Sequence, residues 1–357
     1  MFRASNISNH FILEYIWIGG NGELRSKTRV LHSPSTVNSI HEIPLWNYDG
    51  SSTSQAPSDS NTEVILKPVK LYLDPLRKRE KENENPKHAV QSYIVLCETY
   101  DNSNNPLPSN TRRKAFDIFS DIECIEQLPW FGLEQEYMIV FKELLSYTNP
   151  ELILAPRPNH PEHYCGTMTG NIYRTIVEEH LQACIYAGLK ISGVNAEVTK
   201  HQWEFQIGPC EGIDAADELY VARYLLERIA NKYDMMISYE PKFCETLNGS
   251  GCHTNFSTKK MREENGMDEI LKCMDKLREK HNLHMEVYGK NNEKRLTGIH
   301  ETAPYDKFTY GIGTRNTSIR IGNQTAKDGM GYFEDRRPAA NMDPYLVTSI
   351  LFETCCC

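Results

Sequence analysis

The first hundred residues alternate short apolar runs with turn residues. The apolar runs are rich in β-branched and aromatic side chains, which favour strands. Four strands are predicted, at residues 14–18, 28–31, 64–66 and 93–97. The sequence Gly-Gly-Asn-Gly at 19–22 marks a turn after the first of them. This part of the chain therefore reads as a small β-rich unit.

Two polar stretches interrupt the pattern. Residues 77–92 carry charged and amide side chains without apolar periodicity, which predicts a solvated loop. Residues 101–108 are rich in Asn and Pro, which is typical of a linker. A chain of 357 residues exceeds the ~250–300 that one core usually serves. We therefore predict two domains, at 1–107 and 108–357.

Helical spacing begins after the linker. A helix is predicted from Ser109 or Asn110 to about residue 127, and three more at 173–187, 216–233 and 267–281. The expected inward residues are Ala115, Ile118, Phe119 and Ile122 in the first helix and Ile270, Leu271, Met274 and Leu277 in the last. The helix at 173–187 should end at Gly188, a suitable C-terminal cap. Strands are predicted between the helices, at 133–140, 203–207, 252–257 and 317–321.

Composition excludes several classes of protein. No apolar run reaches the ~20 residues that a membrane-spanning helix needs, so we expect no membrane span. The net charge is −9 and no basic run stands out, which argues against nucleic acid as a partner. The 11 cysteines form no CxxC pair, which argues against a zinc ribbon or a small disulfide framework. With no signal-peptide core near the N-terminus, these features predict a cytoplasmic protein.

Acidic residues stand at strand spacing within apolar segments. Glu134 and Glu136 share one face of a predicted strand, where they repel each other unless a cation lies between them. The alternative is an exposed strand face. Further candidates follow in similar settings: Glu197, Glu204, His253 and Glu334. A single imidazole, although more often structural, suits Mg²⁺ or Mn²⁺ when it accompanies five carboxylates.

Four arginines accompany the acidic residues. They are Arg295, Arg315, Arg320 and Arg336. The planar guanidinium donates two hydrogen bonds at once to a phosphate or a carboxylate. Acidic metal ligands together with several arginines indicate a site for a polyphosphate and a second anion. The chain has neither a Walker motif nor the kinase motifs, so another fold must hold the nucleotide.

The same residues carry a resemblance to a known family. The chain resembles the eukaryotic-type (class II) glutamine synthetases from about residue 14 to 350. Seven motifs occur in the family order: WNYDGSST at 46–53, WFGLEQEY at 130–137, NAEV at 195–198, QWEFQIGPCEG at 202–212, NGSGCHTNFST at 248–258, RLTGIHET at 295–302 and YFEDRRP at 332–338. The resemblance implies an α+β protein, with an N-terminal β-grasp domain before a catalytic α/β domain that has a curved antiparallel sheet. It also implies a double-ring homo-oligomer, expected to be a decamer, with active sites between subunits.

The resemblance also implies roles for individual residues. Two or three Mg²⁺ or Mn²⁺ ions are expected per site, held by two sets of ligands: Glu134, His253 and Glu334, and then Glu136, Glu197 and Glu204. ATP, the co-substrate, is expected along Trp130, Asn255, Phe256, Ser257, Arg315, Arg320 and Tyr332. L-Glutamate is expected at Asn248, Gly249, Arg295 and Arg336. The expected catalytic residues are Asp49, Glu301 and Arg315.

These roles imply an ATP-dependent ligase that forms glutamine through a γ-glutamyl phosphate. Arg315 would offset charge on the transferring phosphoryl group. Asp49 would take the proton that ammonium must lose before attack. Glu301 would close over the intermediate and exclude water.

The chain departs from the family pattern at several places. Thr246-Leu247 replaces the usual Asn-Trp before Asn248, the loop at 167–174 differs, the loop at 79–92 is longer, and Cys355–Cys357 stand at the C-terminal end. Two alternatives remain open: a γ-glutamyl ligase acting on an amine other than ammonia, and a non-catalytic structural or regulatory relative. An intact Asp49, which implies a small, charge-selective ammonium pocket, argues against the first alternative. A non-catalytic relative would be free to lose metal ligands, and this chain keeps all six candidates.

Overall fold

A computed structural model describes residues 9–33, 37, 39–59, 61–77, 91–141, 163–167 and 171–357. The loop predicted at 77–92 lies mostly outside the described residues, as does part of the loop at 167–174. The chain divides into two compact units. Unit 1 comprises Met1–Lys114 with Ala183–Gly188, and unit 2 comprises Ala115–Gln182 with Leu189–Cys357.

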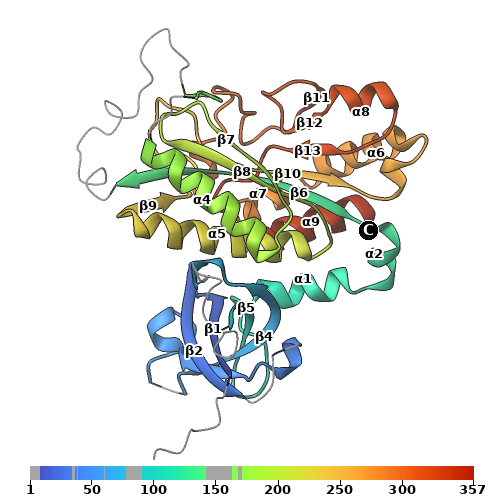
Figure 1. Cartoon of the computed structure of the whole chain (residues 1–357). Coiled ribbons are helices and arrows are strands. Elements are labelled where there is room, and N and C mark those ends of the chain that lie inside the picture. Colours follow the sequence, from blue (N-terminus) through green and yellow to red (C-terminus); the bar gives the residue numbers. More distant parts are fainter. Residues whose placement is uncertain are drawn as a thin grey trace, which may run out of the picture. The chain divides into compact units, whose positions relative to one another are not determined.

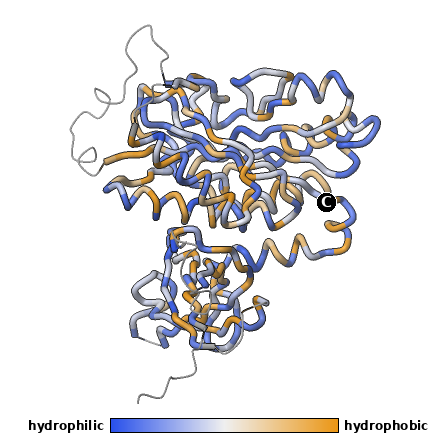
Figure 2. Tube along the Cα trace, viewed as in Figure 1, coloured by the Kyte–Doolittle hydropathy of each residue, from blue (hydrophilic) through white to orange (hydrophobic). Residues whose placement is uncertain are grey.

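Unit 1 is built on a five-stranded sheet with the order β2-β1-β5-β4-β3. Its strands are β1 (Asn9–Ile18), β2 (Leu24–Ser33), β3 (Trp46–Asp49), β4 (Glu63–Leu73) and β5 (Gln91–Tyr100). β1 runs antiparallel to β2 and parallel to β5, so the sheet is mixed. The four strands predicted here are confirmed, and each is longer than the apolar run that identified it. Alternate residues of β1, among them Phe11, Leu13 and Tyr15, form the core, and Figure 2 shows hydrophobic positions along this strand.

Unit 2 is built on an eight-stranded, mainly antiparallel sheet with the order β11-β12-β13-β10-β6-β8-β7, and β9 also pairs with β6. The strands are β6 (Trp130–Phe141), β7 (Ile191–Ala196), β8 (Gln202–Glu211), β9 (Met235–Ser238), β10 (Cys252–Ser257), β11 (Tyr310–Ile312), β12 (Ile319–Ile321) and β13 (Phe333–Asp335). β11 and β12 pair in parallel, so this sheet is mixed as well. The expected α+β class with a curved sheet is confirmed, and the four strands predicted in this region are all present.

The helices of unit 2 cover its sheet and connect its strands (Figure 1). They are α1 (Thr111–Phe119, which begins in unit 1), α2 (Ile122–Gln127), α4 (Asn171–Ala187), α5 (Asp214–Lys232), α6 (Gly266–Glu279), α7 (His281–Val287), α8 (Asn323–Asp328) and α9 (Pro344–Cys356). α5 packs against β6, β8 and β9, and α9 packs against α5, α6 and α7. No helix in the described part of the chain is long and apolar enough to cross a membrane.

The first predicted helix is wrong in one respect: it is two helices. Asp121 interrupts it, because its carboxylate accepts the N–H of Glu123 at 2.8 Å and caps the start of α2. The break turns Ile122 outward, where it is 70% exposed instead of buried as predicted. Ala115 and Phe119 are buried as expected.

The later helices follow their predicted spacing more closely. α4 ends at Ala187, directly before Gly188, whose φ of +85° suits glycine, as predicted. In α6, Ile270, Met274 and Leu277 are buried, but Leu271 is 38% exposed, so its predicted inward position is wrong. Its neighbours at i−1, i+3 and i+6 define the buried stripe, and Leu271 lies at the edge of that stripe.

Helix α9 was not predicted from the sequence, because most of its surface is apolar. Nine of its residues, including Val347, Leu351 and Phe352, are buried. A helix that is buried all round shows no amphipathic period. Asp343 caps its first turn by accepting the N–H of Tyr345 at 2.9 Å.

Candidate functional site

The chemistry-bearing residues of unit 2 meet on one face of its sheet because of strand register. His253 of β10 lies opposite Glu134 of β6, and Glu204 of β8 lies opposite Glu136. Glu334 of β13 lies opposite Asn255 of β10. Since side chains alternate between the faces of a strand, this register brings the acidic residues of three strands and His253 of a fourth to one surface.

Two groups of three potential metal ligands occur among the described residues. The first group is Glu134, His253 and Glu334. Each residue offers one ligand atom, and these three atoms lie within 4.8 Å of one another. His253 Nδ1 lies 3.6 Å from the carboxylate of Glu134 and 3.3 Å from that of Glu334. Burial, and then the charge of Arg336, hold the pKa of His253 well below its usual range. Two carboxylates and one neutral imidazole suit a hard divalent cation.

The second group contains three glutamates, Glu136, Glu197 and Glu204, with ligand atoms that also lie within 4.8 Å of one another. Burial, followed by the charge of Glu197, raises the pKa of Glu136 to about 8. Burial and the neighbouring carboxylates raise the pKa of Glu204 to about 9, and burial also raises the pKa of Glu197. Two buried carboxylates and a partly buried one at this spacing are costly on their own, and a divalent cation between them offsets both the burial and the repulsion. The donor set therefore fits Mg²⁺ or Mn²⁺.

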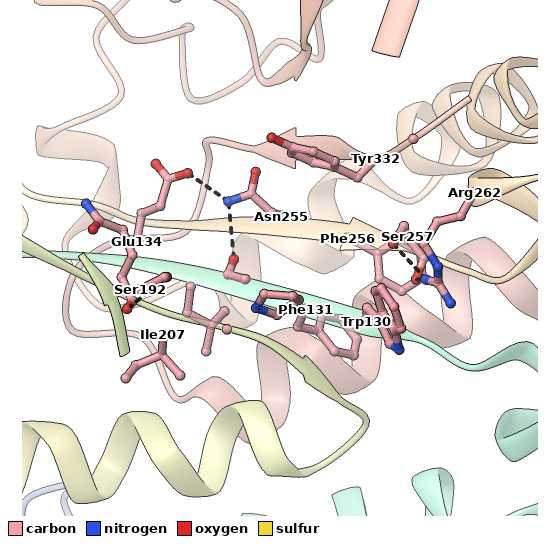
Figure 3. A pocket seen from close by; sticks show the side chains of 16 residues that line it. Trp130, Phe131, Glu134, Ser192, Ile207, Asn255, Phe256, Ser257, Arg262 and Tyr332 are labelled. Atoms are coloured by element: carbon pink, nitrogen blue, oxygen red, sulfur yellow. Dashed lines mark hydrogen bonds between the residues drawn. The ribbon is translucent and has the colours of Figure 1, made fainter. Parts of the chain in front are cut away.

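A cavity of about 470 Å³ opens beside the first group (Figure 3). Its lining includes Trp130, Asn255, Phe256, Ser257 and Tyr332, five of the residues expected to bind ATP. Trp130 and Tyr332 are 40% and 52% exposed, so each ring has surface that can meet a ligand. Asn255 donates to the Glu134 carboxylate at 2.7 Å, which joins the cavity to the first group of ligands. Phe256 is fully buried and shapes the wall from the core side.

Arg262 belongs to this cavity, although sequence reasoning missed it. Its guanidinium lies 3.9 Å from the centre of the Trp130 ring and donates to Ser257 Oγ at 2.8 Å. It thereby fixes the aromatic wall at one end of the cavity, as Figure 3 shows. Arg262 stands in a short 3₁₀ turn without strand or helix periodicity, so nothing in its pattern indicated a role.

A smaller polar hollow lies beside the second group of ligands. It brings together Asn248, Gly249, Arg295 and Arg336, the residues expected to bind glutamate. Glu136, Glu197, His253 and Glu301 share its lining. Arg295 is buried, which lowers its pKa to about 10 yet leaves it charged at neutral pH. Two guanidinium groups in one hollow suit an anionic ligand such as a carboxylate.

The residue change before Asn248 has a structural explanation. Leu247, in the Thr246-Leu247 pair, packs against the core formed by Met138, Val140 and Cys244. Its carbonyl accepts a hydrogen bond from Lys242. Leu247 therefore packs against this core directly before Asn248, which lines the hollow.

Two exposed side chains at the rim form a pair. Arg315 Nη1 lies 3.3 Å from the carboxylate of Glu301, and both side chains are nearly half exposed. Arg315 also hydrogen-bonds to Tyr164, which raises the pKa of Arg315. Glu301 has a φ of +64°, a conformation that a residue with a side chain seldom adopts. Tyr164, to which the sequence analysis gave no role, is thus a further residue of the rim.

The remaining arginines surround Glu334. Arg336 Nη1 lies 2.5 Å from this carboxylate and Arg320 Nη1 lies 3.5 Å from it. Arg336 Nε also donates to the carbonyl of Arg315 at 3.0 Å, which ties the first group of ligands to the rim. Arg320 does not line the cavity described above, although it was expected to bind ATP.

Asp49 lies in unit 1, whereas every other expected site residue lies in unit 2. It ends β3 and caps the 3₁₀ turn at Gly50–Thr53. Its carboxylate accepts from Ser51 N at 3.0 Å and Ser51 Oγ at 2.7 Å. These hydrogen bonds hold its pKa below the usual range, so the exposed side chain is an anion at neutral pH.

Comparison with known proteins places these features in one family. The glutamine synthetase catalytic domain matches residues 108–275. A protein of Acanthamoeba polyphaga mimivirus, provisionally named a glutamine synthetase, is 52% identical and covers 99% of this chain and 98% of its own. The glutamine synthetase nodule isozyme of Lupinus luteus is 47% identical, and cytosolic isozyme 2 of Glycine max is 46% identical. Each of these two covers 99% of this chain and 96% of its own.

Proposed function

The chain belongs to the glutamine synthetase family, and we propose that it ligates ammonia to the γ-carboxylate of L-glutamate in an ATP-dependent reaction. One observation carries the proposal: two groups of metal-ligand candidates lie side by side, with a nucleotide-sized cavity next to one and an arginine-lined hollow next to the other. The products are L-glutamine, ADP and phosphate, formed through γ-glutamyl phosphate.

The two groups of ligands would hold Mg²⁺ or Mn²⁺. Glu134, His253 and Glu334 would hold one ion, and Glu136, Glu197 and Glu204 another. When bound, these ions neutralise phosphate charge and orient the transferring phosphoryl group. The rise in pKa at the three glutamates supports this assignment, because a cation compensates buried carboxylates that otherwise take up protons.

The 470 Å³ cavity would hold ATP, with its base between the exposed faces of Trp130 and Tyr332. Asn255 and Ser257 offer polar groups along the wall, and Phe256 shapes it. Arg320 and Arg315 would meet the phosphates. Arg315 is assigned to the transferring group because its exposed guanidinium stands at the rim.

Glutamate would occupy the polar hollow. Arg295 and Arg336 would bind its carboxylates, while Asn248 and Gly249 would contact the α-amino end. Transfer of the γ-phosphoryl group makes the side-chain carboxylate an acyl phosphate, which has a good leaving group. Ammonia then attacks the carbonyl carbon and phosphate departs.

Ammonium must lose a proton before it attacks. Asp49, an exposed anion with a lowered pKa, would attract the cation and accept that proton. Glu301 would close the rim over the intermediate and keep water out, helped by its pairing with Arg315.

We further propose a double-ring homo-oligomer, expected to be a decamer, in which Asp49 of one subunit serves the unit 2 of its neighbour. The test mixes inactive Asp49→Ala and Glu334→Ala subunits and refolds them together. Partial activity in the hybrid oligomers would support active sites shared between subunits. No activity in hybrids that are shown to have formed would place each active site within one chain. A cytoplasmic location is proposed as well, because several relatives are named cytosolic isozymes.

The central experiment measures ADP release by the purified protein with Mg²⁺ or Mn²⁺. We expect release that depends on both glutamate and ammonium, with glutamine formed in equal amount. Release that requires glutamate but prefers an organic amine would indicate another γ-glutamyl ligase. No release, in a folded protein that binds Mn²⁺, would indicate a non-catalytic relative. Glu334→Gln serves as the inactive control.

A further inference from the structure

Glu197 differs from its partners in how its position is fixed. Glu136 and Glu204 lie within β6 and β8, where ladder hydrogen bonds hold the backbone on both sides. Glu197 follows the last residue of β7 and begins the turn that leads to β8. A ligand at the start of a turn depends on local contacts for its place.

One of those contacts is made by His163, a buried residue outside the motifs of the sequence analysis. Its Nδ1 lies 2.6 Å from the backbone carbonyl of Glu197. Its Nε2 accepts the backbone N–H of His201, with a separation of 3.3 Å between the nitrogens. The imidazole therefore joins the first residue of the turn to its fifth.

These two bonds define the state of the imidazole. A backbone N–H can only donate, so Nε2 must present its lone pair to His201. A neutral imidazole then carries its proton on Nδ1, where it donates to the carbonyl of Glu197. A neutral imidazole therefore satisfies both backbone groups of the turn, the carbonyl of Glu197 and the N–H of His201.

His163 is itself held in place by its surroundings. Its ring packs edge-on against Trp203, with centroids 5.7 Å apart at 77°. Next to it, Cys165 N donates to the carbonyl of Ala196 at 3.0 Å, which attaches the segment 163–167 to the end of β7. Arg174 on α4 donates to the carbonyl of Gly166 at 2.8 Å. These contacts fix the segment that carries the imidazole to the end of β7 and to α4.

The turn needs such support. His201 has a φ of +69°, in the left-handed region, which strains a residue that carries a side chain. Its ring stacks on Tyr173 of α4 at 4.3 Å. The strained end of the turn is therefore clamped from two sides, by Tyr173 at its ring and by His163 at its N–H.

We propose that His163 is a positioning residue that holds Glu197 in place as a ligand of the second cation. The proposal rests on the proposed function, since it takes Glu136, Glu197 and Glu204 as a cation site. Groups that support a metal ligand typically contribute about 10–100-fold to metal affinity. Loss of His163 should weaken the second cation site and spare the site of Glu134, His253 and Glu334.

The test compares three variants of the full chain. His163→Phe keeps an aromatic ring near Trp203 but has no N–H to donate. His163→Asn keeps a side-chain N–H close to the Nδ1 position. His180→Phe is the matched control, because His180 is a fully buried histidine on α4 that bonds the carbonyl of Ala222 on α5 at 3.0 Å.

Mn²⁺ titration by calorimetry provides the readout, and Glu197→Gln and Glu134→Gln identify which binding step belongs to which site. We expect His163→Phe to weaken the step lost in Glu197→Gln by about 10–100-fold and to leave the other step unchanged. His163→Asn should recover most of that loss. His180→Phe should lower the melting temperature with both steps intact. In activity assays, His163→Phe should raise the Mn²⁺ concentration needed for half-maximal rate while kcat at saturating Mn²⁺ stays close to that of the wild type.

Several outcomes would overturn the inference. They are an unchanged second step in His163→Phe, equal weakening of both steps, or a loss in His163→Asn as large as in His163→Phe. If the wild-type protein shows fewer than two Mn²⁺-binding steps in calorimetry, the second cation site does not exist and the inference is wrong. A wild-type protein with both steps that makes no glutamine would instead refute the proposed function, and the His163 result would still decide the positioning role.

Discussion

Charged groups on strands and charged groups on loops divide the site into two regions of different character. Glu136, Glu204, His253 and Glu334 lie on strands, and each is less than 9% exposed. Glu301 and Arg315 lie on loops, are nearly half exposed, and hold each other across 3.3 Å. Five of the six proposed cation ligands lie on strands, which fix their positions, and the sixth, Glu197, begins the turn after β7. The contrast teaches that proposed ligands, which need fixed positions, lie mainly on the sheet, while the groups proposed to close over the intermediate lie on loops.

The largest expected effect tests the loop region. Arg315→Ala should lower the rate of phosphoryl transfer by ~10³–10⁵-fold, because an arginine on the transferring group offsets developing charge. ADP release in single-turnover assays measures the step. Mn²⁺ binding should remain as in the wild type, since Arg315 belongs to neither ligand group. If Arg315→Ala also loses Mn²⁺ binding, the proposed separation between cation ligands on strands and catalytic groups on loops is contradicted.

Asp49→Ala should reduce ammonium-dependent turnover by ~10²–10⁴-fold, the usual contribution of a positioned base. Hydroxylamine is largely neutral at pH 7 and needs no deprotonation, so it should restore a substantial part of the activity. Arg315→Ala should not recover with hydroxylamine and serves as the control. Equal losses with both nucleophiles would make Asp49 structural, and Glu301 would be the next candidate for the base.

Glu204→Gln tests the strand region, and here function and stability should move in opposite directions. Loss of a ligand should weaken Mn²⁺ binding at the second site by at least ~10-fold, because even supporting residues contribute that much. The metal-free protein should become more stable, because the substitution removes a buried carboxylate whose pKa is raised to about 9. Calorimetry and thermal melting with a chelator measure the two effects.

Glu123→Gln, on the exposed surface of α2, is the matched control and should change neither quantity. A Glu204→Gln protein that is less stable than the wild type under chelation would show that the carboxylate has a structural role.

The smallest expected effect is a pH dependence of metal-free stability. Glu136 and Glu204 have raised pKa values of about 8 and about 9 in the folded protein, against 4.5 for an ordinary glutamate. Between pH 4.5 and these values the folded state binds more protons than the unfolded state, so stability should fall as pH rises through this range. Denaturant melts with a chelator at pH 6 and pH 8 should show the decrease, and saturating Mn²⁺ should reduce it. Stability that rises with pH would mean that neighbouring groups already compensate these carboxylates.

The strand-borne half of the site was predictable because its signal is local. Glu134 and Glu136 stand two residues apart within an apolar run, and His253 and Asn255 do the same. Spacing of two places side chains on one face of a strand wherever that strand lies. The structure then joins the two strands in register, with His253 opposite Glu134, and this pairing depends on contacts between distant segments.

The sequence by itself identified the candidate site residues, and the family motifs predicted roles for them. It also determined most of the strands and helices, since their periodicity is a property of neighbouring residues. Tertiary structure alone decided that Arg262 stacks on Trp130, that Ile122 faces outward after the break at Asp121, and that His163 clamps the turn of Glu197. Each of these depends on contacts between segments that packing brings together, and no local spacing records such a contact.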